Sequence, residues 1–429
     1  MPETATDLEP VEDFRLRLRS WLADNMPRAR RRGAAPLRPR GQMSDEEELA
    51  EVAYHRELQR RLFEGGFAGI CFPKEYGGQG LTPEHQKVFN EEIWPYDYPA
   101  RLQVPPMQPC ATIILDFGTE EQKRRHIPAI LRGDEIWMQM LSEPSGGSDV
   151  AGAQTTAVRD GDEWVLNGSK IWTTGAWWSD WALCLARTNW DVPKHRGLTV
   201  FMVPLRHEGI EIHRIEMLNG SREFCQEFLT DVRIPDSDRI GEVDQGWTVG
   251  TRWMFYEKSF SVSFYVTRPT PPEGSGDGMS VGGDTSLITE ARRRGTLNDP
   301  ATRELIGEAH ALSLVSSEAN RRIGEAIATG KMSDQGAGLS KIIGGTLGIR
   351  VANINFQLAG PAAAAWTEDS RAAGDQGVAF LTRQASQIGG GTTEMARNVV
   401  SERLLLMPRE RTLDRDIPFR DVPRGPSTG

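Results

Sequence analysis

The sequence lacks a long hydrophobic run, a cysteine framework and an apolar leader. Its longest uncharged apolar stretch, Phe356 to Trp366, is far shorter than the roughly 20 residues that a membrane-spanning helix needs. The four cysteines form no CxxC pair, which argues against a disulfide framework and favours a reducing compartment. The acidic start MPETATDLEPVEDF does not resemble a secretory signal. We therefore expect a cytoplasmic protein with no membrane segment.

An excess of positive charge is also missing. The formal net charge is −10, whereas a nucleic-acid-binding domain usually has a basic face. Only residues 28–40 are strongly basic, and the acidic segment DEEELAE follows shortly after them. We expect this run to be a solvated loop and expect no nucleic-acid partner.

Several common motifs of catalysis and cofactor binding do not occur. The chain has no GxxxxGK[ST], no predicted strand followed by GxGxxG, and no HExxH. Its seven histidines show no metal-ligand spacing, and His207 and His213 have no Cys or His partner nearby. We therefore expect no metal site.

What the chain does contain is a hydrophobic period that changes twice. Apolar residues three, four and seven positions apart predict helices over 11–26, 45–64 and 82–92, with another from Thr119. Short segments bounded by Gly, Pro, Asn or Asp then predict a block of strands without helices between them, as in an antiparallel sheet or barrel. The helical period returns after Gly246. It predicts helices over 247–264, 300–329, 333–359, 375–384 and 394–406.

The predicted fold class is therefore α+β and multidomain. We expect an N-terminal α-helical domain, a central antiparallel β domain and a C-terminal four-helix-bundle domain. The Pro-rich and Gly-rich segment within the last domain predicts a mobile loop. The expected bounds are 1–136, 137–245 and 246–429, with the loop at 268–285.

Two segments of the predicted β domain carry unusual chemistry. In residues 143–149, a proline turn precedes two glycines and Ser148, and exposed N–H groups beside a hydroxyl suit an anionic ligand. An ordinary loop explains the same residues equally well. Trp172, Thr173 and Thr174 end a strand with one aromatic ring and two hydroxyls, a combination that suits a stacking wall with a donor.

These segments resemble the acyl-CoA dehydrogenases. The resemblance extends over about residues 10–410 and implies bound FAD and oxidation of an acyl-CoA thioester to the 2-enoyl-CoA in lipid metabolism. It also implies electron-transferring flavoprotein as the acceptor and a dimeric or tetrameric homo- or hetero-oligomer. The matching pieces, in order, are QKVFNEEI, GTEEQKRRHIPAILRGDEIW, SEPSGGSDVAG, NGSKIWTTG and QIGGGTTEMAR.

Matched position by position, the resemblance implies FAD contacts from two subunits. The neighbouring subunit's Arg-x-Thr pair corresponds to Arg294 and Thr296, although Leu297 and Asn298 replace the usual Phe-Gly that follows. The adenosine half would meet the neighbour's Gln357 and Gly360. Within one subunit, the implied contacts are Leu141 (backbone), Ser142, Trp172, Thr174 and Thr392 with the flavin, and Ser148 with the pyrophosphate.

The position of the catalytic base departs from many family members. They carry a Glu directly before Gly-Thr in the last matched segment, where this chain has Gly390. Other members place the base on the first helix after the β domain, in a Glu-Arg pair. The corresponding residues here are Glu257 and Lys258. Either the chain is inactive at this position or the base comes from elsewhere, and Glu257 is the residue at the alternative position.

Periodicity supports Glu257 independently of the resemblance. Trp253, Phe260 and Phe264 recur on its predicted helix face, and no Lys or Arg stands three or four residues away. A carboxylate in apolar surroundings has a raised pKa, which suits removal of a carbon-bound proton. The alternatives are a surface glutamate at the edge of the stripe, or Glu394 as the base.

The glycines around Gly390 have a predicted role of their own. Gly390 retains its N–H, which can donate to the enolate oxygen, and consecutive glycines leave space for a bulky or branched acyl group. We assign Lys258, Gly390 and Gly391 to substrate binding.

Three other functions stay open from the residues. The chain could be the FAD-holding, non-catalytic subunit of a hetero-oligomer. It could also be a flavin oxidase or monooxygenase on the same scaffold. A non-enzymatic binding module is the third, and the acidic balance argues against its nucleic-acid-binding form.

Overall fold

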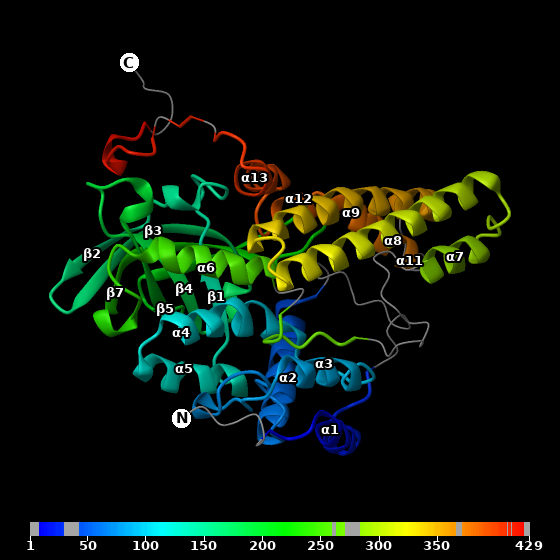
Figure 1. Cartoon of the computed structure of the whole chain (residues 1–429), viewed down its shortest axis with the longest axis horizontal. Coiled ribbons are helices and arrows are strands. Elements are labelled where there is room, and N and C mark those ends of the chain that lie inside the picture. The colour runs from blue at the N-terminus through cyan, green and yellow to red at the C-terminus, as the bar shows by residue number, and fades with distance from the viewer. Residues whose placement is uncertain are drawn as a thin grey trace.

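The chain runs through helices, then a sheet, then helices again, so the predicted α–β–α fold is confirmed (Figure 1). The basic run at 28–40 and the loop predicted at 268–285 fall mostly outside the residues that the structure describes. The computed structural model describes residues 8–29, 43–259, 263–270, 284–365, 371–409, 411–412 and 414–423.

The N-terminal helices begin and end close to their predicted bounds. Phe14, Leu18 and Leu22 are all buried on α1, as their spacing predicts. The helix α2 begins at a capping box in which Ser44 and Glu47 exchange hydrogen bonds. The helices are α1 (Val11–Asn25), α2 (Asp45–Glu64), α3 (Pro83–Glu92), α4 (Thr112–Phe117) and α5 (Glu120–Arg132), and α4 has no counterpart among the predicted helices.

The central region is one eight-stranded sheet with the order β6-β7-β3-β2-β4-β5-β8 and with β1 paired to β4. The hairpin predicted around Asp160 and Gly161 is confirmed, since β2 and β3 pair from Asp160 opposite Glu163. The strands are β1 (Trp137–Met140), β2 (Thr156–Asp160), β3 (Glu163–Thr174), β4 (Trp181–Arg187), β5 (Leu198–Pro204), β6 (Ile210–Ile215), β7 (Phe224–Pro235) and β8 (Arg239–Ile240).

The sheet differs from a purely antiparallel one at β4, to which both β1 and the start of β2 run parallel. A parallel pair needs a long connection, and here the chain leaves β1 through the loop at 141–155 before it re-enters the sheet. The predicted functional turn at 143–149 is therefore part of a crossover at the end of β1.

The helix α6 (Gly246–Ser259) lies against the sheet and carries Glu257 near its C-terminal end (Figure 1). Its residues Val249, Trp253 and Tyr256 are buried in one core with side chains of β4, β5, α4 and α5. The predicted extension of this helix to Phe264 is wrong, because Phe264 lies in a bend. The described helix runs to Ser259, and positions 260–262 lie outside the described residues.

The C-terminal helices form an arm that extends away from the sheet (Figure 1). The long helix α9 is its centre and packs against α8, α11, α12 and α13. No helix in the described ranges has the length and apolar character that crossing a bilayer requires. The helices are α7 (Asp284–Arg293), α8 (Pro300–Ala328), α9 (Ala337–Ala359), α10 (Pro361–Ala364), α11 (Arg371–Thr382), α12 (Ala385–Ile388) and α13 (Thr393–Val399).

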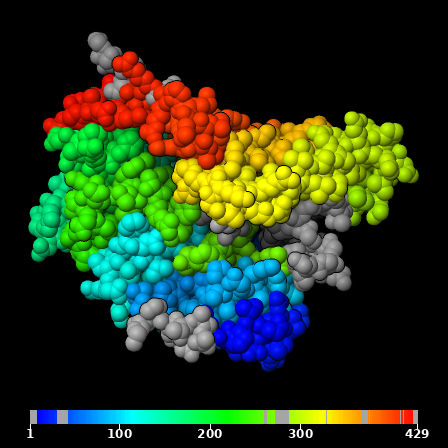
Figure 2. Space-filling view, viewed as in Figure 1, coloured from blue at the N-terminus to red at the C-terminus, as the bar shows by residue number. Residues whose placement is uncertain are grey.

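The segment after α13 returns to the β domain and covers part of its surface (Figure 2). The Phe419 N–H donates to the carbonyl of Val192 over 2.9 Å, and the guanidinium of Arg187 lies 3.7 Å from the centre of the Phe419 ring. Lys194 bridges Asp149 and Asp414 at 2.9 and 2.7 Å. The end of the described chain is thus attached to the loop that carries the predicted anion-binding turn.

Candidate active site

Glu257 is a partly buried carboxyl on the last turn of α6. Burial raises its pKa above the ordinary value. The Lys258 charge, a hydrogen bond from the Gln139 side chain and the Lys341 charge oppose this rise without cancelling it. The sequence-based expectation of an up-shifted carboxyl agrees with this direction, although Trp253 is the only member of the predicted stripe that the described helix carries beside it.

Gln139, which sequence reasoning missed, connects this helix to the sheet. It lies on β1, and its Oε1 accepts a hydrogen bond of 2.7 Å from Nε1 of Trp253. Its backbone carbonyl lies 3.4 Å from the hydroxyl of Thr173. The only signal in the sequence is a polar residue within the apolar strand Trp137–Met140.

The glycine loop follows α12 and faces the end of α6. Gly390 and Gly391 have φ angles of 70° and 92°, which favour glycine. A Cβ at Gly390 would meet nothing within 4 Å, whereas one at Gly391 would lie 3.4 Å from Cε of Lys258. The structure therefore brings Glu257, Lys258, Gly390 and Gly391 into one region, with open space beside Gly390.

Lys341 of α9 holds this loop in place. Its Nζ donates to the carbonyl of Ser386 over 2.9 Å and to the carbonyl of Gly389. Burial lowers the pKa of Lys341, and the Glu257 charge works in the opposite direction. Sequence reasoning missed this lysine too, because only the fold brings α9 beside the loop.

Near the end of β3, Trp172 is exposed, Thr174 is partly buried and Thr173 between them is buried. A bulge in the pairing with β7 at this point gives Trp172 a φ of 68°, and its side chain is 50% exposed. The ring contacts Phe224 edge-on, with the ring centres 5.9 Å apart. An aromatic face held open in this way can take a stacked ring.

The loop after β1 is held by a buried ion pair. Glu143 accepts hydrogen bonds from the backbone N–H groups of Gln154 and Thr155, at 2.6 and 2.9 Å, and from Nζ of Lys170 at 2.8 Å. Lys170 is fully buried and also donates to the carbonyls of Leu141 and Leu185. Burial alone would raise the pKa of Glu143, but the Lys170 charge and these donors hold it below its usual value.

The turn itself stays open to solvent. Ser148 is exposed, and a Cβ at Gly146 or Gly147 would lie no closer than 3.6 Å to any atom outside the adjoining residues. The N–H groups of Gly147 and Ser148 donate no hydrogen bond to another residue that the structure describes. Such amides suit phosphate oxygens, and the exposed Trp172 ring suits an isoalloxazine. The residues present therefore fit the FAD that the resemblance implies.

The residues implied to serve a neighbouring subunit lie apart from this region. Arg294 follows α7 at the far end of the arm (Figure 1) and donates to the carbonyl of Leu358. A Cβ at Gly360 would come within 2.3 Å of this guanidinium, so only glycine fits beneath it. Gln357 is exposed on the same helix end, and Thr296 is partly buried next to Arg294. The structure brings Arg294 and Gly360 together in one chain.

Thr392 and Glu394 belong to the first turn of α13. The Thr392 side chain caps the helix by accepting from the N–H of Met395 over 3.1 Å. The Glu394 side chain is 76% exposed, and hydrogen bonding at the helix start lowers its pKa. A solvated carboxylate of lowered pKa is a weak proton acceptor, which disfavours Glu394 as the base.

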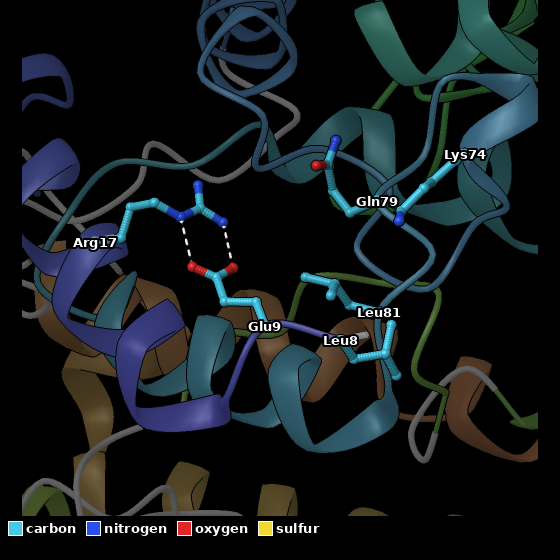
Figure 3. A pocket seen from close by; sticks show the side chains of 6 residues that line it. All are labelled: Leu8, Glu9, Arg17, Lys74, Gln79 and Leu81. Atoms are coloured by element: carbon cyan, nitrogen blue, oxygen red, sulfur yellow. Dashed lines mark hydrogen bonds and ion pairs between the residues drawn. The ribbon is translucent and has the colours of Figure 1, made fainter. Parts of the chain in front are cut away.

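A separate cavity of about 260 Å³ lies among the N-terminal helices and contains none of the predicted site residues (Figure 3). A two-point ion pair between Arg17 and Glu9 crosses one side of it. Its lining is Leu8, Glu9, Arg17, Lys74, Gln79 and Leu81. Among the described residues, no group of three His, Cys, Asp or Glu side chains could hold a metal ion.

Known proteins match this chain over nearly its whole length. Models of the N-terminal, middle and C-terminal domains of acyl-CoA dehydrogenases match residues 28–134, 139–232 and 285–405. The acyl-CoA dehydrogenase IpdE1 of Mycobacterium tuberculosis is 30% identical over 406 residues, which cover 94% of this chain and 99% of the relative.

Solved structures also match nearly the whole chain. The Tcur3481-Tcur3483 steroid ACAD is 27% identical, with a TM-score of 0.72 and coverage of 94% of this chain and 99% of that one. The ChsE4-ChsE5 complex from Mycobacterium tuberculosis is 26% identical, with a TM-score of 0.68 and coverage of 95% and 100%.

Proposed function

This chain belongs to the acyl-CoA dehydrogenase family, and we propose that Glu257 is the base with which it removes the α-proton of its substrate. The protein is an FAD-dependent oxidoreductase that acts on the CH–CH bond of an acyl-CoA in lipid β-oxidation. When bound, FAD accepts the hydride that leaves the β-carbon. The chain's own residues must bind the thioester, take the α-proton and stabilise the enolate oxygen.

The observation that carries the proposal is a carboxyl of raised pKa at Glu257, directly before Lys258, whose side chain lies against Gly391 of the glycine loop. The α-proton of a thioester is weakly acidic, and a base is most effective when its pKa approaches the working pH. The charges of Lys258 and Lys341 lower the pKa of this carboxyl and so oppose the effect of its burial. Gly390, at the position of the base in other members, has no side chain that could compete.

We assign the oxyanion contact to the backbone of the same loop. The N–H of Gly390 donates to no other described residue, so it is available to the thioester oxygen. Losing one such donor costs about 3 kcal/mol of transition-state stabilisation in other enzymes. Lys341 fixes the loop that presents this group through its two carbonyl contacts.

The open space beside Gly390 supports a bulky or branched acyl group, such as a polycyclic one. The structural neighbour described as a steroid ACAD is in keeping with this substrate class. We expect higher kcat/KM with a polycyclic acyl-CoA than with butyryl-CoA. Activity restricted to short straight chains would contradict it.

The partners are also proposals. We expect electron-transferring flavoprotein to be the acceptor, and Arg294, Thr296, Gln357 and Gly360 to contact the FAD of a neighbouring subunit. We expect a homo- or hetero-oligomer, and two structural neighbours whose names join two different proteins support the hetero-oligomer. We propose that the protein is cytoplasmic. We also propose that its three domains span residues 1–136, 137–245 and 246–429.

The test of the base is Glu257→Gln, with Glu394→Gln as its control. We expect Glu257→Gln to lower turnover by about 10³-fold with an artificial electron acceptor. Flavin absorbance should stay at the wild-type level, and Glu394→Gln should keep its activity. Wild-type turnover in Glu257→Gln would overturn the assignment. Rapid oxygen uptake by the unaltered protein would instead identify the flavin oxidase.

A further inference from the structure

We propose that Gln139 is a positioning residue that fixes the direction of the Glu257 carboxylate. The inference rests on the proposed role of Glu257 as the base. It starts from three interacting groups: the indole of Trp253, the side-chain amide of Gln139 and the carboxyl of Glu257. Trp253 and Glu257 stand one turn apart on α6, and Gln139 reaches both from β1.

The amide of Gln139 has only one orientation that satisfies its neighbours. The indole N–H of Trp253 can donate but cannot accept, so the atom 2.7 Å away must be the amide oxygen. The NH₂ end then points to the other neighbour, the Glu257 carboxyl, which accepts its hydrogen bond. Trp253 is fully buried, so its indole N–H has this amide oxygen as its acceptor in place of water.

Gln139 itself is held by the sheet. It pairs with Leu183 of the central strand β4, and its carbonyl lies near the Thr173 hydroxyl. Thr173 is the buried residue between Trp172 and Thr174, the proposed wall of the flavin site. Gln139 therefore contacts both the helix that carries the proposed base and the strand segment that carries Trp172. These contacts fix the distance between the base and the proposed flavin wall.

The other groups that face Glu257 are charged. Lys258 comes from its own helix and Lys341 from α9, and both favour the carboxylate form, while burial favours the acid. Gln139 supplies the one contribution from the sheet side. Removing a donor to the carboxylate destabilises the ionised form, so the pKa of Glu257 should rise and the low-pH limb of kcat should move to higher pH.

The decisive variant is Gln139→Leu in the full-length, FAD-loaded protein. We expect the low-pH limb of kcat to move up by about one pH unit, which lowers kcat about tenfold on that limb, with KM unchanged. Trp253→Phe keeps the ring but frees the amide to turn, so we expect a smaller shift in the same direction. Gln59→Leu is the matched control, because Gln59 is buried and donates to Leu131 over 2.6 Å, away from Glu257.

A structural role alone would lower the melting temperature in Gln139→Leu as in Gln59→Leu, and would leave the pH profile in place. That outcome would overturn the proposal. Should Gln139→Leu not fold, Gln139→Glu keeps the shape and an acceptor for Trp253, and its added carboxyl should move the limb further upward. No movement in either foldable variant rejects the positioning role.

A direct titration separates this inference from the proposed function. The carboxylic-acid infrared band that disappears in Glu257→Gln reports the protonation of Glu257 without turnover. We expect its midpoint to move to higher pH in Gln139→Leu. If Glu257→Gln is inactive and this midpoint does not move, Glu257 stays the base and Gln139 has no positioning role. If Glu257→Gln is active, the proposed function fails while the band still tests the contact.

Discussion

Glu143 and Glu257 are both withdrawn from water, but the protein surrounds them differently. Glu143, in the loop after β1, receives two backbone N–H groups and the buried ammonium of Lys170, and its pKa is held low. Glu257, at the end of α6, receives one amide and two lysine charges, and its pKa rises. A carboxylate that holds a loop accepts hydrogen bonds at both oxygens, which lowers its pKa. A carboxylate that must take a proton has fewer donors around it, so its pKa stays higher.

The largest expected effect comes from replacing Lys170, the counter-ion of Glu143. In Lys170→Met, Glu143 stays buried without its counter-ion, and we expect unfolding to become easier by about 3–5 kcal/mol. Denaturant unfolding would measure this, and flavin retention should fall because the turn at 144–149 loses its support. The double variant Glu143→Gln with Lys170→Met should recover part of the loss. Equal stability of Lys170→Met and the wild type would contradict the role assigned to the pair.

A third buried carboxyl, Glu227 on β7, sharpens the comparison. It accepts from Thr173 over 2.9 Å, its other oxygen has no partner among the described residues, and burial raises its pKa to about 8 from 4.5. The native state therefore keeps a proton that the unfolded chain releases, so stability declines as pH rises from about 4.5 to about 8.

Glu227→Gln should remove this decline. The wild-type slope reaches up to about 1.4 kcal/mol per pH unit within that window, and the variant should be more stable than the wild type at pH 8 and above. Melting temperatures measured from pH 5 to pH 9, at about one-unit steps, would show it. Parallel curves for the two proteins would mean that Glu227 is ionised throughout.

The smallest expected effect comes from Lys341→Met. The glycine loop loses the donor to its carbonyls and Glu257 loses a nearby positive charge, so we expect turnover to fall about tenfold. The low-pH limb of kcat should also move upward, since the carboxylate is less favoured. Lys331→Met, an exposed lysine in the turn before α9, is the control. An unchanged limb would show that Lys341 acts on the loop alone.

Much of this architecture follows from local sequence. Apolar spacing identified α1 and α2, and the Asp160-Gly161 turn identified the β2–β3 hairpin. The end of α6 did not follow, because aromatic spacing marks one face of a helix and carries no stop signal, and Phe264 lies in a bend.

The site residues also fall into two groups, those that the sequence indicates and those that only the fold reveals. Glu257 could be singled out because the family resemblance places a base at this position and because Trp253, one turn before it, is visible in the sequence. Gln139 and Lys341 could not, because each reaches the base or its loop from a distant segment, β1 in one case and α9 in the other. Such contacts exist only after the sheet and the helical arm have come together, and no local period encodes them.

The return of the chain end to the β domain has a practical consequence. Phe419 rests on Arg187, whose guanidinium also binds the carbonyls of Ala151 and Ala153, and Asp414 shares Lys194 with Asp149. An affinity tag or a truncation near residue 414 therefore disturbs the crossover beyond β1, because Asp414 and Phe419 contact the residues that hold that crossover. Protein tagged or truncated at the C-terminal end should release its yellow flavin on dilution sooner than protein tagged at the N-terminal end.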